Sequence, residues 1–303
     1  MRTSILALAV MAACTSGPGR DAAPQHGGAV AQAPAASAAP APTAVGLHWP
    51  LLDTIGRRLV AFDTQVTNTQ QELRTRSATP GGDSLFLKFR ESYMAVAESL
   101  TERLGDDSTG QGLSISRDGW SDSLRSVLQR HGFALNFSEG NAFVDEDVGY
   151  ILGAFGPLLT PAMREYLSIR NVEHHVRFSE DAALQIPWDA LGDRIATWEV
   201  FLHKYPTFSW RNAAQYWRTM YLETYLTGMD NTRTFTNSGT LEQDVRKSYE
   251  HFLRTHARMP AAAVIRDYLA LVEANATPSD STIKRFLREH DLESMLGVQP
   301  PVN

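Results

Sequence analysis

From His48 onward the hydrophobic residues recur at intervals of three and four, which is the spacing of one face of an α-helix. This pattern predicts a helix over residues 50–76, a second helix over residues 86–105, and a shorter helix that ends at His131 and Gly132. The sequence TPGGDS between the first two helices is typical of a turn. We therefore expect these two helices to form an antiparallel helical hairpin.

A different period appears between residues 133 and 144, where apolar and polar residues alternate around the sequence Ser-Glu-Gly-Asn. Alternation is the strand period, so this stretch predicts one small β-hairpin. The acidic run Asp145–Asp147 follows and predicts the start of another helix, with Asp145 as its N-cap. Thr160 and Pro161 have the character of an N-cap and a first helical residue, which predicts a further helix to about Val176.

The C-terminal part predicts helices in pairs. A first helix is expected over residues 188–202, and Ser209 is the predicted N-cap of its partner. Thr240 and Gln243 have the spacing of a capping box, which predicts the next helix. Its partner begins near Pro260.

A short motif recurs in this region. The sequence Trp198-x-x-Phe201-Leu202-His203 returns as Tyr249-x-x-Phe252-Leu253-Arg254 and as Ile283-x-x-Phe286-Leu287-Arg288. The second and third copies are 286 − 252 = 34 residues apart, which is the length of a tetratricopeptide repeat. These segments resemble helix pairs of the tetratricopeptide-like class, and the resemblance implies stacked pairs with a concave binding surface.

The predicted fold is therefore mainly α. Helical hairpins and the small β-hairpin occupy residues 47–178, tetratricopeptide-like helix pairs occupy residues 179–297, and residues 298–303 form a tail.

The N-terminal residues MRTSILALAVMAAC have the composition of an export signal: one arginine, a short apolar run, and small residues before a cysteine. The apolar run is shorter than the roughly 20 residues that cross a bilayer as a helix. The ending Met11-Ala12-Ala13-Cys14 resembles the lipobox of bacterial lipoproteins, although leucine is commoner than Met11 at its position. The resemblance implies that residues 1–13 are a signal peptide and that Cys14 carries the lipid; an ordinary cleaved signal and an uncleaved anchor are the alternatives.

Residues 15–46 are rich in alanine, proline and glycine and show no helical or strand period. We expect them to form, after the lipidated Cys14, a disordered tether between the membrane and the folded part. By resemblance to lipoprotein sorting in bacteria with two membranes, Thr15 after the cysteine favours the outer membrane, facing the periplasm.

The composition argues against a nucleic-acid partner and against a bound cofactor. The formal net charge is −6 and no dense run of lysine and arginine is present, which argues against nucleic acid as a partner. Cys14 is the only cysteine. No glycine-rich phosphate loop and no dinucleotide-binding motif occurs, so we expect no cofactor.

Two clusters are candidates for chemistry. Glu173-His174-His175 is the most metal-like, and Glu180 or Asp181 could assist it, but adjacent helical residues point about 100° apart and cannot both face one ion. A structural or surface role is therefore favoured over a metal site. Glu139 and an Asp near 145–147 could act as acid and base on a glycan, while the simpler interpretation is that these carboxylates cap a helix.

The favoured function is a membrane-tethered envelope module that binds a protein or peptide and acts without a cofactor. The alternative is an envelope glycan-active enzyme, similar to a peptidoglycan hydrolase, that uses Glu139 and an Asp near 145–147. Four tryptophans lie within residues 188–217, and the stripe that includes Trp198 is typical of a core face. We therefore predict that Trp198 and Trp217 are buried.

Overall fold

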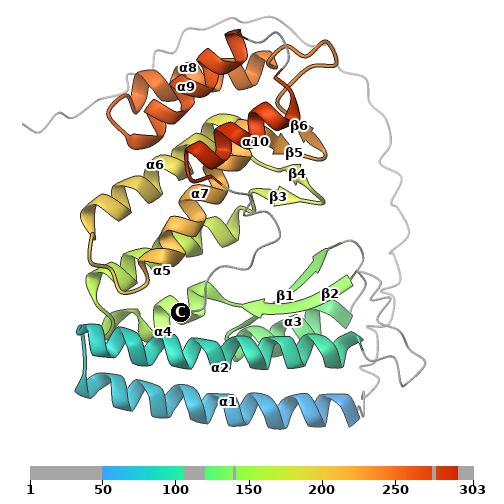
Figure 1. Cartoon of the computed structure of the whole chain (residues 1–303). Coiled ribbons are helices and arrows are strands. Elements are labelled where there is room, and N and C mark those ends of the chain that lie inside the picture. Colours follow the sequence, from blue (N-terminus) through green and yellow to red (C-terminus); the bar gives the residue numbers. More distant parts are fainter. Residues whose placement is uncertain (1–49, 106–119, 139–140, 275–277, 293–303) are drawn as a thin grey trace, which may run out of the picture. The chain divides into compact units, whose positions relative to one another are not determined.

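The computed structural model describes residues 50–105, 120–138, 141–274 and 278–292 (Figure 1). Within these residues the chain is mainly helical, with ten α-helices and three small two-stranded antiparallel sheets. The predicted fold class is thus confirmed. Across the described ranges, no helix combines the length and the apolar character that crossing a membrane requires.

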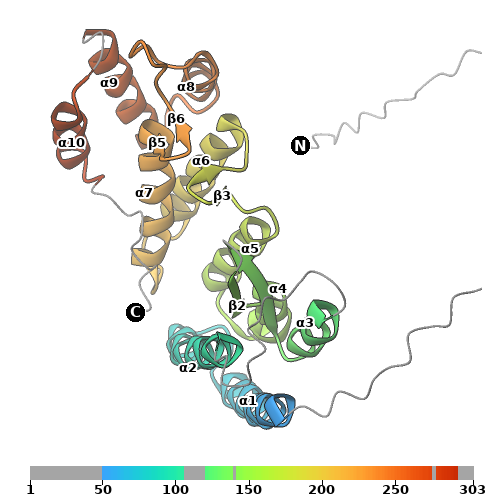
Figure 2. The same cartoon turned by 90° about the vertical axis from the view of Figure 1, so that its right-hand side faces the viewer.

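Helices α1 (Pro50–Thr75) and α2 (Pro80–Gly105) form the predicted helical hairpin and lie side by side (Figures 1 and 2). The predicted turn is too long, because α2 already begins at Pro80. Proline fits the first helical position, where no N–H is needed. The Thr79 hydroxyl accepts a hydrogen bond from the Gly82 amide at 3.1 Å and so satisfies one free donor of that first turn.

The predicted β-hairpin is confirmed as strands β1 (Phe133–Ser138) and β2 (Asn141–Glu146), which follow helix α3 (Trp120–Arg130). Leu135 pairs with Val144 across the two strands. One face of the hairpin is buried, since α2 contacts β2 and α3 contacts β1. The side chains of Phe143 and Asp145, two residues apart on β2, lie on the opposite face and line the cleft described below.

Helix α4 (Val148–Phe155) follows the hairpin, and a short 3₁₀ helix, η1 (Gly156–Leu158), connects it to α5 (Pro161–His175). The prediction that Asp145 caps this helix is wrong, because β2 continues through Glu146. Asp147 is the N-cap instead, and its carboxylate accepts a hydrogen bond from the Tyr150 amide at 2.9 Å. The predicted cap of α5 is confirmed: the Thr160 hydroxyl accepts from the Met163 amide.

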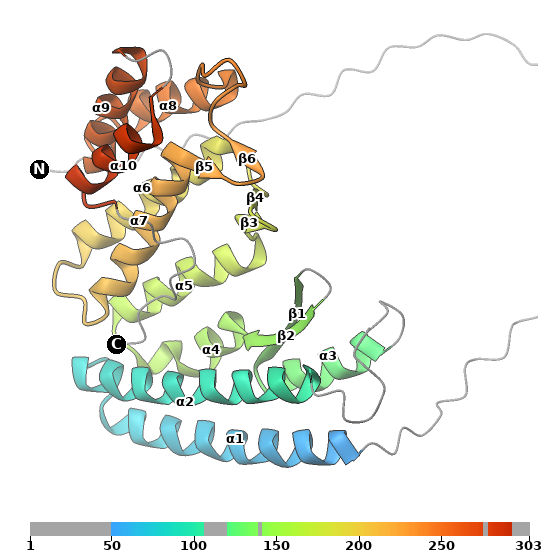
Figure 3. The ribbon, with the colours of Figure 1, turned by 45° about the vertical axis from the view of Figure 1, so that its right-hand side comes forward.

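The remaining helices are α6 (Trp188–Lys204), α7 (Arg211–Thr227), α8 (Gln243–Thr255), α9 (Pro260–Ala274) and α10 (Asp280–Glu289). Helix α6 packs against α7 and α8, and α8 packs against α9 (Figure 3). The helices therefore pack in the pairs that the sequence pattern predicts.

Helices α6, α8 and α10 end in the same way, and this shared ending is the structural form of the repeated motif. In each helix the motif phenylalanine is buried, and its ring contacts an aromatic ring at the C-cap residue four positions later. The C-cap amide also donates to the carbonyl of that phenylalanine. The three pairs are Phe201 with Tyr205, Phe252 with His256, and Phe286 with His290, at ring-centroid distances of 5.1, 4.9 and 4.2 Å.

Two further β-ribbons were not predicted. They are β3 (Ser179–Glu180) with β4 (Ala183–Leu184), and β5 (Gly228–Met229) with β6 (Thr232–Arg233). Strands of two residues are too short to show an alternating pattern. A hydrogen bond joins the turns of the two ribbons: the Asn231 side chain donates to the carbonyl of Asp181 at 2.7 Å.

Two predicted helix caps are wrong. The N-cap of α7 is Trp210 rather than Ser209, and no side chain caps this helix, whose entry is fixed by the burial of Phe208 and Trp210. Helix α8 begins at Gln243 with Glu242 as its N-cap. The Thr240 hydroxyl contacts that of Thr236 within the preceding turn at 2.8 Å and does not cap the helix.

Candidate functional site

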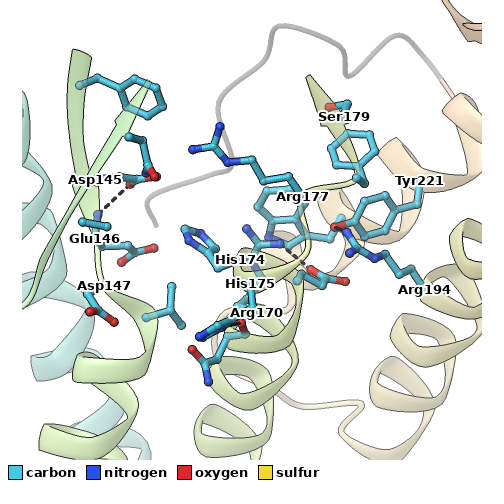
Figure 4. Close-up of a pocket in the computed structure, with 18 residues that line it drawn as sticks. Asp145, Glu146, Asp147, Arg170, His174, His175, Arg177, Ser179, Arg194 and Tyr221 are labelled. Atoms are coloured by element: carbon cyan, nitrogen blue, oxygen red, sulfur yellow. Dashed lines mark hydrogen bonds and ion pairs between the residues drawn. The ribbon is translucent and has the colours of Figure 1, made fainter. Parts of the chain in front are cut away.

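A cleft of about 410 Å³ opens beside the outer face of the β1–β2 hairpin, and helices α5, α6 and α7 supply its other walls (Figure 4). We call it the polar cleft, after its charged and polar lining. Its lining includes Asp145, Glu146, Arg170, His174, Arg177 and Trp217. The site thus joins the two clusters that the sequence singled out separately.

Glu146 lies on the buried face of β2 and forms an ion pair with Arg90 of α2. The guanidinium donates to both carboxylate oxygens at 2.9 and 2.5 Å, and it lies 4.9 Å above the Trp210 ring. Burial alone would raise the pKa of Glu146, but the charge and hydrogen bonds of Arg90 lower it below the ordinary value. Glu146 is therefore an internal counter-ion and is poorly suited to act as a general acid.

Arg170 of α5, on the opposite side of the cleft, also forms an ion pair with a glutamate. It donates to Glu173 at 2.5 Å, and the other oxygen of that carboxylate accepts from the Trp198 indole at 2.9 Å. The guanidinium also stacks on the Trp217 ring at 3.4 Å from its centroid. These contacts order the arginine and neutralise its charge.

Trp198 is completely buried, as predicted, but the prediction for Trp217 is wrong. Trp217 is partly exposed and lines the polar cleft. Its indole N–H donates to the Tyr166 hydroxyl at 3.2 Å, and its face carries Arg170. One face of the ring is therefore taken up by a largely buried guanidinium instead of apolar side chains.

Asp145 and His174 are two titratable groups of the cleft, and neither forms an ion pair within the described residues. The Asp145 carboxylate accepts the Glu146 amide at 2.8 Å, and in the described ranges it forms no ion pair. The His174 ring points toward strand β2 (Figure 4). Burial, with Glu146 nearby, raises the pKa of Asp145, and burial, with Arg170 nearby, lowers the pKa of His174.

The two histidines of the metal-like cluster have different surroundings. His175 is exposed, and its Nδ1 lies 2.7 Å from the Asn171 carbonyl one turn earlier, whereas His174 faces the cleft. Glu173 is committed to Arg170. In the part of the chain that is described, no three histidine, cysteine or acidic side chains are grouped so that they could hold a metal ion.

The predicted glycan-active pair of Glu139 with an Asp near 145–147 stays a prediction, because one of its members is not described. Glu139 lies outside the described residues, as does the predicted lipid-bearing Cys14. Of the acidic run, all three residues line the cleft, but Glu146 is paired with Arg90 and Asp147 caps α4, so in the described residues Asp145 is the one with neither an ion pair nor a capping role.

A second concave surface of about 940 Å³ lies where α6 and α7 meet α9 and the end of α10. We call it the repeat groove and define it by Val200, Arg211, Gln215, Arg258 and Met259. Val200 is 51% exposed, which is unusual for a large apolar side chain in this protein.

The base of the repeat groove is held by another buried pair. Arg218 donates twice to Glu199, at 3.0 and 2.7 Å. The same carboxylate accepts the Ala261 amide in the first turn of α9 at 3.0 Å, so it also caps that helix. The second oxygen of Glu199 accepts the same Ala261 amide at 3.2 Å, so both oxygens are used inside the fold, and the accessible charges of the groove are mainly positive.

Sequence reasoning missed most residues that shape the polar cleft. The spacing of Arg170 and Glu173 is that of an i, i+3 ion pair and could have suggested their contact. Arg90 gave no such signal, since its partner Glu146 is 56 residues away.

Comparisons of this chain with protein-family models, with curated proteins and with solved structures found no match. The resemblance to the tetratricopeptide-like class therefore stays a prediction from the repeated motif.

Proposed function

We propose that this protein is a lipid-anchored module of the bacterial envelope that binds a protein or peptide partner and uses no cofactor. The observation that carries the proposal is the repeated helix ending of α6, α8 and α10, which gives three successive units one common packing device. Arrays of such units expose extended surfaces that hold partner segments.

The repeat groove is the surface to which we assign the partner. It combines the exposed Val200 and the partly buried Met259 with the side chains of Arg211 and Arg258. Arg211 uses one nitrogen to bond the Leu202 carbonyl, and Arg258 forms no ion pair within the described ranges. An apolar contact flanked by cations favours a segment that carries both hydrophobic and acidic side chains.

The anchor completes the proposal. Acylation of Cys14 would hold the protein at the membrane, and residues 15–46 would give the folded part room to reach its partner. With Thr15 after the cysteine, we propose the outer membrane, on the periplasmic side, in a bacterium with two membranes.

A photo-crosslinking experiment in the producing cell tests the interaction. A photoreactive amino acid is placed at Gln215 in the groove or, as a control, at Arg266, which is exposed on α9 and does not line the groove. We expect a discrete protein adduct from position 215 and none from position 266. Adding Arg258→Glu should remove the adduct, while adding Arg266→Glu should leave it.

No adduct at position 215, or the same adducts at both positions, would contradict the proposal. A direct assay addresses the alternative function: purified protein is incubated with peptidoglycan. Release of soluble glycan fragments that Asp145→Asn abolishes would establish the glycan-active enzyme in place of the binding module.

A further inference from the structure

The polar cleft supports an inference that goes beyond partner binding at the repeat groove. Its cations are already committed to internal partners. Arg170 pairs with Glu173 at 2.5 Å, and Arg177 pairs with Glu180 at 3.0 Å. Arg194 donates to the Val176 carbonyl and lies 3.3 Å from the Tyr221 hydroxyl. An anionic ligand would therefore compete with contacts that the fold already makes.

Two groups of the cleft that can accept a hydrogen bond or pair with a cation, Asp145 and His174, have no ion-pair partner among the described residues. Asp145 is mostly buried, and the described part of the chain offers its carboxylate no cation within ion-pair distance. His174, also partly buried, makes no hydrogen bond or ion pair there. Arg90 and His174 act on this carboxylate only from beyond ion-pair distance, so burial still raises its pKa. A ligand cation in direct contact would offset the cost of that burial.

The surrounding walls suit a cation on a short apolar stem. Phe143 and Trp217 both line the cleft, and both rings already have an arginine nearby. The Arg177 guanidinium lies 5.8 Å from the Phe143 centroid, and Arg170 lies 3.4 Å from that of Trp217. Aromatic faces attract positive charge, and their apolar surface packs against methylene groups.

We propose that the polar cleft binds a primary ammonium or guanidinium group, with the Asp145 carboxylate as its counter-ion and the His174 imidazole as a second acceptor. The group could belong to a free amine or to a lysine or arginine side chain, since both present the same chemistry. A metal ion is disfavoured, because Asp145 and His174 supply only two ligands.

Binding should weaken in acid. The pKa of Asp145 is raised by burial and by Glu146, so its charge is lost at a higher pH than that of an ordinary aspartate. The pKa of His174 is lowered by burial and by Arg170, so the ring is a neutral acceptor near neutrality and becomes a competing cation when protonated. Arg90 also faces both groups, and it stays charged throughout this range.

Calorimetric titration of the full chain in detergent tests the proposal. The probes are cadaverine and agmatine, with glutarate as the anion of similar length, and a short peptide with one lysine as the side-chain source. We expect cadaverine or the lysine peptide to bind and glutarate not to bind. Whichever of cadaverine and the lysine peptide binds more tightly identifies the source, and its binding should weaken as the pH is lowered.

Asp145→Asn keeps the shape of the side chain and removes its charge, so it should weaken amine binding by about tenfold or more. His174→Gln should weaken it less and should flatten the pH dependence. Asp267→Asn, on the exposed surface of α9, is the matched control and should change nothing. Thermal melts show whether each variant is folded.

Preferred binding of glutarate would overturn the inference, and so would amine binding that folded Asp145→Asn retains in full. Neither result bears on the crosslinks at the repeat groove, so the two proposals can fail separately.

Discussion

Replacing Trp198 by alanine tests how the C-terminal helices are held together. The ring is fully buried in α6, and its neighbours are the rings of Tyr166 and Phe201 at centroid distances of 5.4 and 5.7 Å. Its indole N–H is also the donor to a buried oxygen of Glu173. The substitution therefore removes both packing and a hydrogen bond at once.

The expected loss can be estimated from these contacts. A buried tryptophan replaced by alanine costs about 3–5 kcal/mol in the free energy of unfolding. The unpaired oxygen of Glu173 adds about 1 kcal/mol or more, although Arg170 still neutralises the carboxylate. Because a domain has only about 5–15 kcal/mol of net stability, the variant should be close to unfolding.

Urea unfolding, followed by far-ultraviolet circular dichroism, measures the loss. Trp198→Phe is the control, because it keeps most of the ring volume while removing the N–H donor, and it should lose clearly less stability than Trp198→Ala. A loss below about 1 kcal/mol for Trp198→Ala would refute the estimate. Equal losses for the two variants would show that the hydrogen bond, and not packing, dominates.

Three further outcomes are expected. Cys14→Ser should move the protein from the membrane fraction to the soluble fraction, as followed by cell fractionation and immunoblotting, and an unchanged distribution would contradict lipid anchoring. Glu146→Gln leaves Arg90 without its buried counter-ion and should cost about 3–5 kcal/mol in a urea melt. Since the pKa of Glu146 is lowered in the folded state, its contribution is present above the unfolded carboxyl range and should be lost as the pH falls through the lowered value. Alanine at both His174 and His175 should leave metal content unchanged by elemental analysis; stoichiometric metal that is lost in the variant would contradict this.

The pattern of the sequence was sufficient for local structure. Apolar residues spaced by three and four predicted the helices, and alternating apolar residues predicted the β1–β2 hairpin. Each spacing places the apolar side chains on one face of a single helix or strand, and that face is the one that becomes buried. The motif around Phe201, Phe252 and Phe286 likewise revealed a repeated packing unit. Element ends were less predictable: Thr160 caps its helix as expected, while Asp145 and Ser209 do not.

The candidate site depended on contacts between distant parts of the chain. Asp145 and His174 belong to separate acidic and metal-like clusters of the sequence, and no local signal places them at one cleft. The commitment of Glu146 to Arg90, and of Glu173 to Trp198, decided which acidic groups stay available for a ligand.

The sequence by itself therefore determined the helical class and the helix periods, since these follow from the order and spacing of neighbouring residues. Only the tertiary structure decided that Trp217 faces a cleft while Trp198 fills the core. Both tryptophans lie on apolar helical stripes, and their burial depends on which distant side chains reach them. Arg170 covers Trp217 from α5, and Tyr166 and Phe201 enclose Trp198.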